Sequence, residues 1–124
     1  MNLEVQLVTE KAVWENYLAS RPEANFLQSW NWQLFHQRLG KTTFALAFQT
    51  QGQWRGAALV IKEEAKRGTY LTVAGGPLID WQDVALVQAV SQALRQLAQQ
   101  HGCQFVRIRP QAISSPALLS LEQQ

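Results

Sequence analysis

The sequence predicts an α/β (α+β) protein with a mixed sheet and the element order β-α-α-β-β-β-α-β. Its 124 residues are 47% hydrophobic and 16% charged, the balance of one globular domain rather than of a disordered chain. Segments with apolar residues at every second position indicate strands, and segments with apolar residues at helical spacing indicate helices. A strand, a long helix and another strand follow one another over residues 69–109, which predicts a parallel pair within an otherwise antiparallel sheet.

The chain opens with a predicted strand and helix. Residues 3–8 alternate and place three apolar side chains on one face, namely Leu3, Val5 and Leu7. A helix over residues 10–19 is expected to be capped by Thr9 and to end before Pro22.

A second helix is predicted over residues 30–39. Ser29 is suited to its N-cap, and Gly40 is expected to stop it. Its aromatic residues fall into two apolar rows, because residues two apart point in roughly opposite directions on a helix. The first row is expected to face the core and the second to be buried as well: Trp32, Phe35 and Leu39 in the first, Trp30 and Leu34 in the second.

Three strands are predicted next, over residues 42–50, 54–63 and 69–74. The middle one is apolar on both faces, which favours a central place in the sheet. A glycine-proline loop follows, and then a helix over residues 82–101 with one apolar stripe. The residues of that stripe are Val84, Val87, Val90, Leu94, Leu97 and Ala98.

The carboxyl-terminal part predicts a strand over residues 103–110 and then the start of a helix, with Ser115 at its N-cap and Pro116 in its first turn. Because no strand follows that half-helix, residues 1–124 are expected to form a single, partial domain that is truncated.

Composition excludes several classes of function. The net charge is +2 and the pI about 9.0, but Lys and Arg are scattered, so no DNA-binding stripe is predicted. The single cysteine, Cys103, allows no internal disulfide, and no metal site is expected. No stretch reads as a secretory signal or as a span of about 20 apolar residues. We therefore expect a cytoplasmic protein.

Three motifs carry a family resemblance. In order, "NFLQSWNWQLFHQRLGK", "GTYLTVAGGPLIDW" and "CQFVRIRP" resemble the FemABX family of peptidoglycan interpeptide-bridge aminoacyltransferases, whose two domains are acetyltransferase-like (GNAT-like). The element order is similar to the first two-thirds of such a domain, and the motifs lie between residues 25 and 110. The resemblance therefore covers the amino-terminal part of the first domain.

The resemblance implies an enzyme that transfers an amino acid from aminoacyl-tRNA to the stem peptide of a cell-wall precursor. That precursor is a lipid-linked or nucleotide-linked muramyl peptide. The resemblance therefore implies that the enzyme acts at the inner face of the membrane, with peripheral membrane contact. Contact with aminoacyl-tRNA is implied for later sequence, so this chain alone is not expected to be a competent catalyst. No cofactor is implied. The alternatives are a GNAT-type acyltransferase using acyl-CoA and a non-catalytic binding module derived from this fold.

Two residues of the second helix are candidate substrate contacts. The resemblance implies a lysine that contacts the precursor diphosphate at the position of His36, and Trp30 is expected to line the same groove. A neutral histidine is a weaker anion ligand than lysine, so Arg38 or Lys41 could take over the contact. The alternative is that Trp30 is buried and His36 is structural.

The glycine-proline loop supplies Gly76 and Asp80 as further candidates. Glycines allow close approach to a ligand or simply a turn, and Asp80 could contact the precursor or cap the following helix. Acyl-CoA-binding relatives of this fold carry a Q/R-x-x-G-x-G/A loop here, whose amides hold a pyrophosphate. That pattern is absent, and Pro77 lacks an amide donor, which argues against CoA.

Arg107 and Arg109 are predicted on one face of the last strand. Either they form an anion site for a phosphate or carboxylate, or they pair with Asp80, Asp83 or Glu63, or they are exposed at a sheet edge. Family members often carry an aspartate, viewed as a possible base, at the position of Arg109. With arginine there, the resemblance assigns no catalytic residue.

Overall fold

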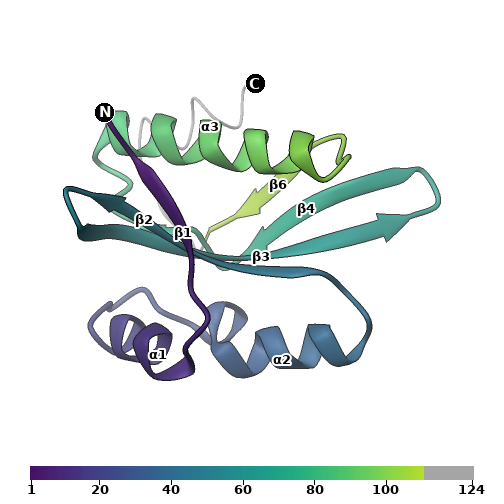
Figure 1. Cartoon of the computed structure of the whole chain (residues 1–124), viewed down its shortest axis with the longest axis horizontal. Helices are drawn as coiled ribbons and strands as arrows, with labels where there is room; N and C mark the ends of the chain where they lie inside the picture. The colour runs from purple at the N-terminus through teal and green to yellow at the C-terminus, as the bar shows by residue number, and fades with distance from the viewer. Residues whose placement is uncertain (111–124) are drawn as a thin grey trace.

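The structure is a computed structural model that describes residues 1–110, so the helix expected after Ser115 lies outside the described residues. The sheet is covered on one side by α1 and α2 and on the other by α3 (Figure 1). The elements, in chain order, are β1 (Glu4–Leu7), α1 (Lys11–Ala19), a 3₁₀ turn η1 (Phe26–Gln28), α2 (Trp30–Arg38), β2 (Thr43–Thr50), β3 (Gln53–Ala65), β4 (Gly68–Ala74), β5 (Leu78–Ile79), α3 (Val84–Gln100) and β6 (Val106–Arg109).

The sheet is mixed, as predicted, with the strand order β1-β2-β3-β4-β6. β3 is central, and β4 pairs with β6 in parallel across the α3 crossover, while the other pairs are antiparallel. One strand is not predicted by the alternation pattern: β5, only two residues long, pairs with β3 at Gly56 and Ala57.

Each face of the sheet has its own apolar core. On the α3 side the alternate residues of the strands pack against α3, for example Phe48, Val60 and Leu71. On the other side the intervening residues pack against α1, with Trp14 fully buried against Leu59 and Leu78. Because successive strand residues point to opposite faces, this division assigns a face to every residue of β3, β4 and β6.

One local prediction near the amino terminus is confirmed and one is wrong. The N-cap residue of α1 is Glu10 rather than Thr9, and its side chain makes no capping hydrogen bond. β1 exists where expected, but its residues are exposed because it pairs only with β2 at the edge of the described sheet.

The expected apolar stripe of α3 is partly corrected. Val84 is 47% exposed, whereas Leu86, which was not assigned to the stripe, is buried. Val84 is the first residue of the helix, and the buried face begins only at Leu86, so helical spacing alone mislocates its start.

The face of α2 that packs on the sheet is only partly the predicted one. Ser29 caps the helix, as expected, by accepting a hydrogen bond from the Trp32 N–H at 3.1 Å. Of the expected core row, Trp32 is partly buried against the core on the α1 side, whereas Phe35 and Leu39 are 47% and 58% exposed, and the most buried residue of the helix is Gln33. Polar contacts add to this packing, because the Gln33 and Gln37 amides both bond to the Thr43 hydroxyl.

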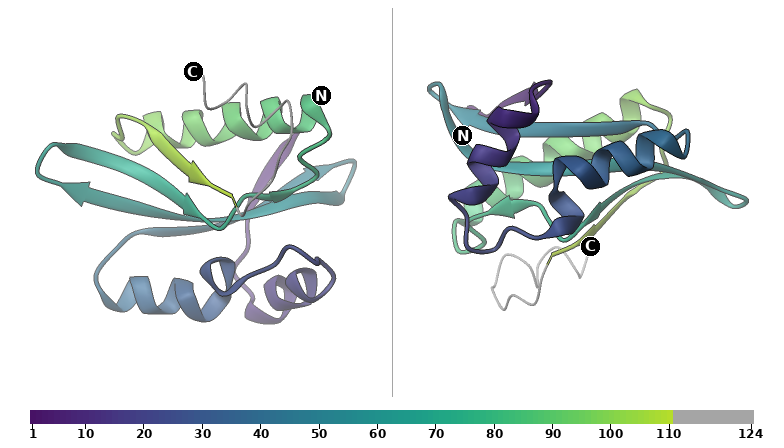
Figure 2. Two further views of the ribbon diagram at one scale, coloured as in Figure 1. Left: turned by 180° about the vertical axis from the view of Figure 1, so that it is seen from behind. Right: turned by 90° about the horizontal axis from the view of Figure 1, so that it is seen from below.

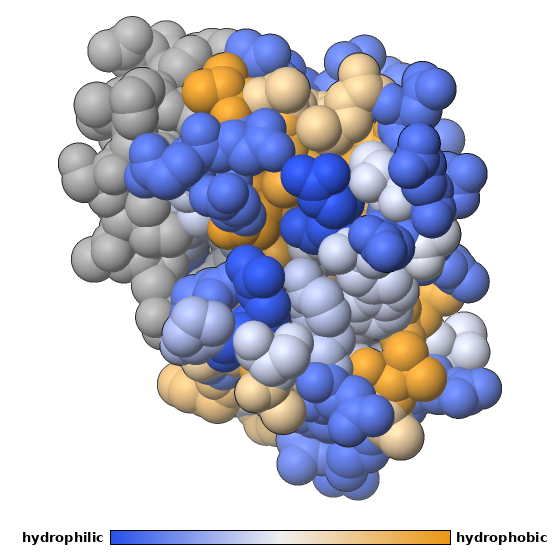
Figure 3. Space-filling view, turned by 90° about the vertical axis from the view of Figure 1, so that its left-hand side faces the viewer, coloured by the Kyte–Doolittle hydropathy of each residue, from blue (hydrophilic) through white to orange (hydrophobic). Residues whose placement is uncertain are grey.

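Within residues 1–110, no helix combines the length and apolar character that crossing a bilayer requires. On the side of the molecule shown in Figure 3, hydrophilic residues dominate and hydrophobic residues form separate patches.

Candidate functional site

The sheet splits at the glycine-proline loop. β4 pairs with the carboxyl half of β3, and β5 pairs with its amino half, so the chain changes direction between Ala74 and Leu78. Gly75 has a φ of +74°, a conformation that favours glycine, and the Gly76–Pro77 peptide bond is cis. Leu59 lies in the gap between the two pairings, with no strand partner on that side.

The side chain of Gln28 fills this gap. Its Oε1 accepts a hydrogen bond from the Leu59 N–H at 2.7 Å, and its Nε2 donates to the Leu59 and Ala74 carbonyls at 3.2 and 2.7 Å. Gln28 is fully buried, and its own carbonyl accepts a hydrogen bond from Trp14 Nε1. The amide therefore acts as a substitute for the missing strand residue and ties η1 to the split sheet.

The glycines of the loop closely approach η1 and the residue before it. Asn25 Nδ2 donates to the Gly75 carbonyl at 2.8 Å. A Cβ atom added to Gly75 would clash with Asn25 Oδ1, and one added to Gly76 would lie 2.6 Å from Gln28 Oε1. The structure thus places Gly76 against the side chain of Gln28. The absence of a side chain at Gly76 lets Gln28, rather than a ligand, come close to the backbone of the loop.

β4 and β6 present a second set of side chains on the α2 side of the sheet. Val106 and Ile108 pack toward the α3 core, so their neighbours face the other way. Figure 2 (right) shows β6, in yellow-green, passing beside α2 rather than beneath it. We call this set the β4–β6 floor; its members are Tyr70, Thr72, Ala74, Phe105, Arg107 and Arg109.

Both arginines of the floor are exposed, and neither forms an ion pair within residues 1–110. The Arg107 guanidinium lies 5.1 Å from the centre of the Tyr70 ring, which stacks on Phe105 at 4.8 Å. The pairing of the arginines with Asp83 or Glu63 that the sequence left open is absent. Asp83 pairs with Arg55 at 3.2 Å, and Glu63 with Lys41 at 3.0 Å.

His36 projects from α2 on the same side of the sheet. Its ring makes edge-to-face contacts with Trp32 and Phe35, at 4.9 and 5.5 Å. Burial, and then the nearby Lys41 ammonium, lower the pKa of His36, and its buried Nδ1 has no hydrogen-bond partner within residues 1–110. Lys41 is held by Glu63, the cross-strand neighbour of Tyr70. His36 therefore lies near one end of the floor, with no hydrogen bond or ion pair to either arginine.

Trp30 and Asp80 lie elsewhere. The Trp30 ring packs against the core on the α1 side, and its backbone N–H donates to Glu15 Oε1 at 2.9 Å. Asp80 is exposed, and its Oδ1 accepts a hydrogen bond from the Gln82 N–H. The structure does not bring these two residues together with His36 and the arginines.

The amino terminus of α3 is occupied by a carboxylate. Asp83, not Asp80, is the N-cap residue, and its Oδ1 accepts a hydrogen bond from the Leu86 N–H at 3.1 Å. The alternative role of Asp80 as the cap of this helix is therefore wrong. A negative charge at this position opposes the binding of a pyrophosphate there.

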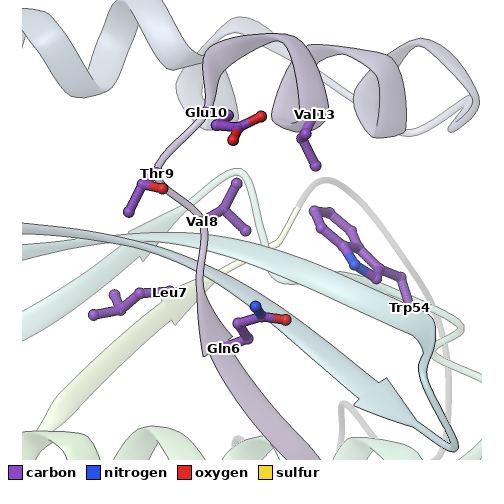
Figure 4. A pocket seen from close by; sticks show the side chains of 7 residues that line it. All are labelled: Gln6, Leu7, Val8, Thr9, Glu10, Val13 and Trp54. Carbon is purple, nitrogen blue, oxygen red and sulfur yellow. The ribbon is translucent and has the colours of Figure 1, made fainter.

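A separate pocket of about 220 Å³ lies between the end of β1, the start of α1 and Trp54 (Figure 4). It is lined by Gln6, Leu7, Val8, Thr9, Glu10, Val13 and Trp54, and includes none of the predicted site residues. Within residues 1–110, no group of three or more His, Cys, Asp or Glu side chains is arranged to hold a metal ion.

Sequence reasoning missed Gln28, Asn25 and the Tyr70–Phe105 pair. Gln28 and Asn25 lie in a segment with no periodicity, and their partners are about 30 to 50 residues away in the sequence, so no local pattern identifies them. The Tyr70–Phe105 contact could have been predicted from the parallel pairing of β4 and β6. Leu71 is paired with Val106, and Tyr70 and Phe105 are the residues just before them.

A mixed sheet with a parallel β4–β6 pair and helices on both faces defines a protein with a GNAT-like acyltransferase fold. The FemAB family model matches residues 9–122, and the chain therefore belongs to the FemAB family. This confirms the resemblance carried by the three motifs and the fold class expected from the element order.

Two solved structures share the fold. The crystal structure of FemX matches with a TM-score of 0.74 and 17% identity, over 85% of this chain and 26% of that chain. An acetyltransferase of Trypanosoma brucei matches with a TM-score of 0.63 and 18% identity, over 98% of this chain and 89% of that chain. The chain thus spans about a quarter of the FemX chain. No curated protein matches significantly. Family and fold together support an acyltransferase-type function.

Proposed function

We propose that this chain belongs to an aminoacyltransferase of the interpeptide-bridge type and that its β4–β6 floor holds the cell-wall precursor. The observation that carries the proposal is the location of three groups in a FemAB-family chain. His36, Arg107 and Arg109 lie on one side of the sheet, and neither arginine has an ion-pair partner within residues 1–110.

The floor suits an anionic ligand. Arg107 and Arg109 are two residues apart on one strand, about 7 Å, and guanidinium forks bind phosphate or carboxylate oxygens in pairs. Thr72 is the cross-strand neighbour of Arg107 and adds a hydroxyl donor between β3 and β6. A muramyl peptide carries both phosphates and carboxylates, so either could be the group that is bound.

The reaction needs mainly positioning. The amine nitrogen of the stem peptide attacks the carbonyl carbon of the aminoacyl ester, and the bond from that carbon to the ribose oxygen breaks. The proton lost by the amine ends on the released hydroxyl. Holding the two reactants at the right distance accounts for much of such a rate enhancement, and no covalent intermediate on the protein is required. In this proposal the described residues orient the precursor, and aminoacyl-tRNA is bound by other parts of the protein.

A second candidate is an acyltransferase that uses acyl-CoA. It is favoured by the match to the T. brucei acetyltransferase, which extends over nearly the whole length of both chains. The Asp83 carboxylate at the amino terminus of α3 and the absent pyrophosphate pattern oppose it.

The proposal is tested by titrating the protein with a nucleotide-linked muramyl peptide. Wild-type protein should bind, and binding should weaken as salt rises, because exposed charge pairs are screened over about 8–10 Å. His36→Lys should strengthen binding by roughly 1 kcal/mol, since a charge-assisted contact replaces a neutral one. Arg107→Ala should weaken it by about 1–3 kcal/mol.

Arg67→Ala is the matched control, because Arg67 is an exposed arginine in the β3–β4 turn, outside the floor. Its affinity should equal that of the wild type. Circular dichroism checks that each variant is folded. Equal affinities for all four proteins, or no binding by any of them, would reject the floor as the precursor site.

A further inference from the structure

The pocket between β1, α1 and β3 has a preformed aromatic wall. Trp54, near the start of β3, is partly buried, and its ring packs against Tyr17 at 4.8 Å and against the fully buried Trp14 at 6.5 Å. Val8 and Val13 add aliphatic surface to the same pocket (Figure 4). Because two other aromatic residues hold the Trp54 ring, this wall exists before any ligand binds.

The pocket also contains one carboxylate without a partner. Glu10 is the N-cap residue of α1, but its side chain makes no capping hydrogen bond and no ion pair within residues 1–110. The neighbouring Lys11 donates a hydrogen bond to Asn31 Oδ1 at 3.3 Å. The seven residues that line the pocket include no lysine, arginine or histidine. The pocket therefore has a negative charge beside an aromatic ring and no cation of its own.

We propose that this pocket binds the primary ammonium group of a short alkyl chain. A cation beside a tryptophan ring is attracted by the ring quadrupole, and a carboxylate accepts charge-assisted hydrogen bonds from N–H groups. The Thr9 hydroxyl is a further acceptor, and it has no hydrogen-bond partner within residues 1–110. Glu10 and Thr9 thus offer acceptors to the three N–H donors of a primary ammonium, whereas quaternary ammonium groups are typically held in cages of several rings.

The volume of the pocket limits the length of the chain. At about 220 Å³ the pocket is smaller than the roughly 300–1,000 Å³ of sites for drug-sized ligands. The aliphatic surfaces of Val8 and Val13 suit a short methylene stem, either of a lysine side chain or of a free alkylamine. None of the residues proposed to hold the cell-wall precursor lines this pocket, so the inference does not depend on the proposed function.

The first test follows the tryptophan indole N–H signals of the full chain by NMR while n-butylammonium is added at constant ionic strength. The chain has five tryptophans, and Trp54→Phe identifies the signal of Trp54 by its loss. That signal should shift and saturate, with a dissociation constant of roughly millimolar size for so small a ligand. The uncharged 1-butanol should give no saturable shift, and tetramethylammonium should bind more weakly than n-butylammonium.

Glu10→Gln should weaken the binding of n-butylammonium about twofold to fivefold, the scale of an exposed ion pair. The matched control is Glu64→Gln, which removes the same charge from an exposed glutamate of β3 outside the pocket. It should bind like the wild type, and the other indole signals show whether each variant is folded. The inference is overturned by a Trp54 signal that does not shift, by equal losses in the two variants, or by an equal response to 1-butanol.

A second titration distinguishes the two sources of the ammonium group. Nα-acetyllysine methylamide carries this group on a peptide backbone. Tighter binding than that of n-butylammonium would assign the pocket to a lysine side chain of a peptide, and equal or weaker binding would assign it to a free alkylamine. If neither compound shifts the Trp54 signal, the pocket is not an ammonium site.

Discussion

His36 stands where the family resemblance implies a phosphate-contacting lysine, and its surroundings favour its neutral form. Burial is the main cause of its lowered pKa, and the Lys41 ammonium is the second. Edge-to-face contacts with Trp32 and Phe35 fix the ring at the same time. A neutral, fixed imidazole can donate or accept one hydrogen bond but contributes little charge, so at neutral pH the anionic ligand would depend mainly on the arginines.

The pKa of His36 predicts a pH dependence of stability. Because it is lower in the folded chain, the unfolded chain binds the proton first as the pH falls, so this contribution is complete above about pH 6.5 and is lost below it. His36→Gln should therefore reduce the fall in the urea midpoint between pH 7.5 and 5.5. Between pH 8 and 7 the two proteins should show the same slope. A variant with an unchanged slope below pH 6.5 would contradict the assignment.

Among the elements, η1 links the two halves of the sheet. Gln28 satisfies the backbone of Leu59 where β3 changes partner, and Asn25 holds the Gly75 carbonyl. The same turn leads directly into α2 through Ser29. The position of His36 relative to Arg109 is thus set by a few hydrogen bonds, since Gly75 also donates to the Arg109 carbonyl at 2.8 Å.

Replacing Gln28 tests this link. Gln28→Leu keeps the approximate volume but leaves the Leu59 N–H and the Ala74 carbonyl without the amide, so it should destabilise the fold by about 3 kcal/mol or more. Gln37→Leu is the control, because its single side-chain bond to Thr43 is exposed, and it should cost less than about 1 kcal/mol. Urea denaturation measures both. Equal stabilities would show that the Gln28 bonds contribute little.

In the molecule as a whole, the split sheet and the start of α3 decide which ligands fit. β5 brings the glycine-proline loop back against β3, and Asp83 occupies the amino terminus of α3 with its carboxylate paired to Arg55. The side of β4 and β6 next to α2 bears arginines instead. The fold therefore offers anion contacts on its sheet rather than at the start of its long helix.

This arrangement predicts no affinity for CoA. Acetyl-CoA at millimolar concentration should give no saturable heat in calorimetry, because a pyrophosphate at the start of α3 would meet the Asp83 carboxylate. The nucleotide-linked muramyl peptide, titrated under the same conditions, is the positive control. Binding of acetyl-CoA at micromolar concentration would favour the second candidate function. It would also contradict the inference that the Asp83 carboxylate keeps a pyrophosphate away from the start of α3.

The sequence by itself determined which elements exist and how they connect. Ser29 and Gly40 delimit α2, the alternation in residues 42–74 defines β2, β3 and β4, and the long helix before β6 requires a parallel return. These features depend on interactions within a few residues or on the handedness of crossovers, so a local pattern contains the information.

Only the tertiary structure decided which face of α2 is buried and how the split sheet is closed. Trp32, Phe35 and Leu39 form one apolar row in the sequence, but only Trp32 packs against the core. Phe35 and Leu39 are exposed, and the buried Gln33 accepts a hydrogen bond from the Thr43 hydroxyl. Gln28 and Leu59 are 31 residues apart, and a buried glutamine in an aperiodic segment shows no pattern. Periodicity identifies a stripe, whereas the neighbours that satisfy its polar groups determine which way it faces.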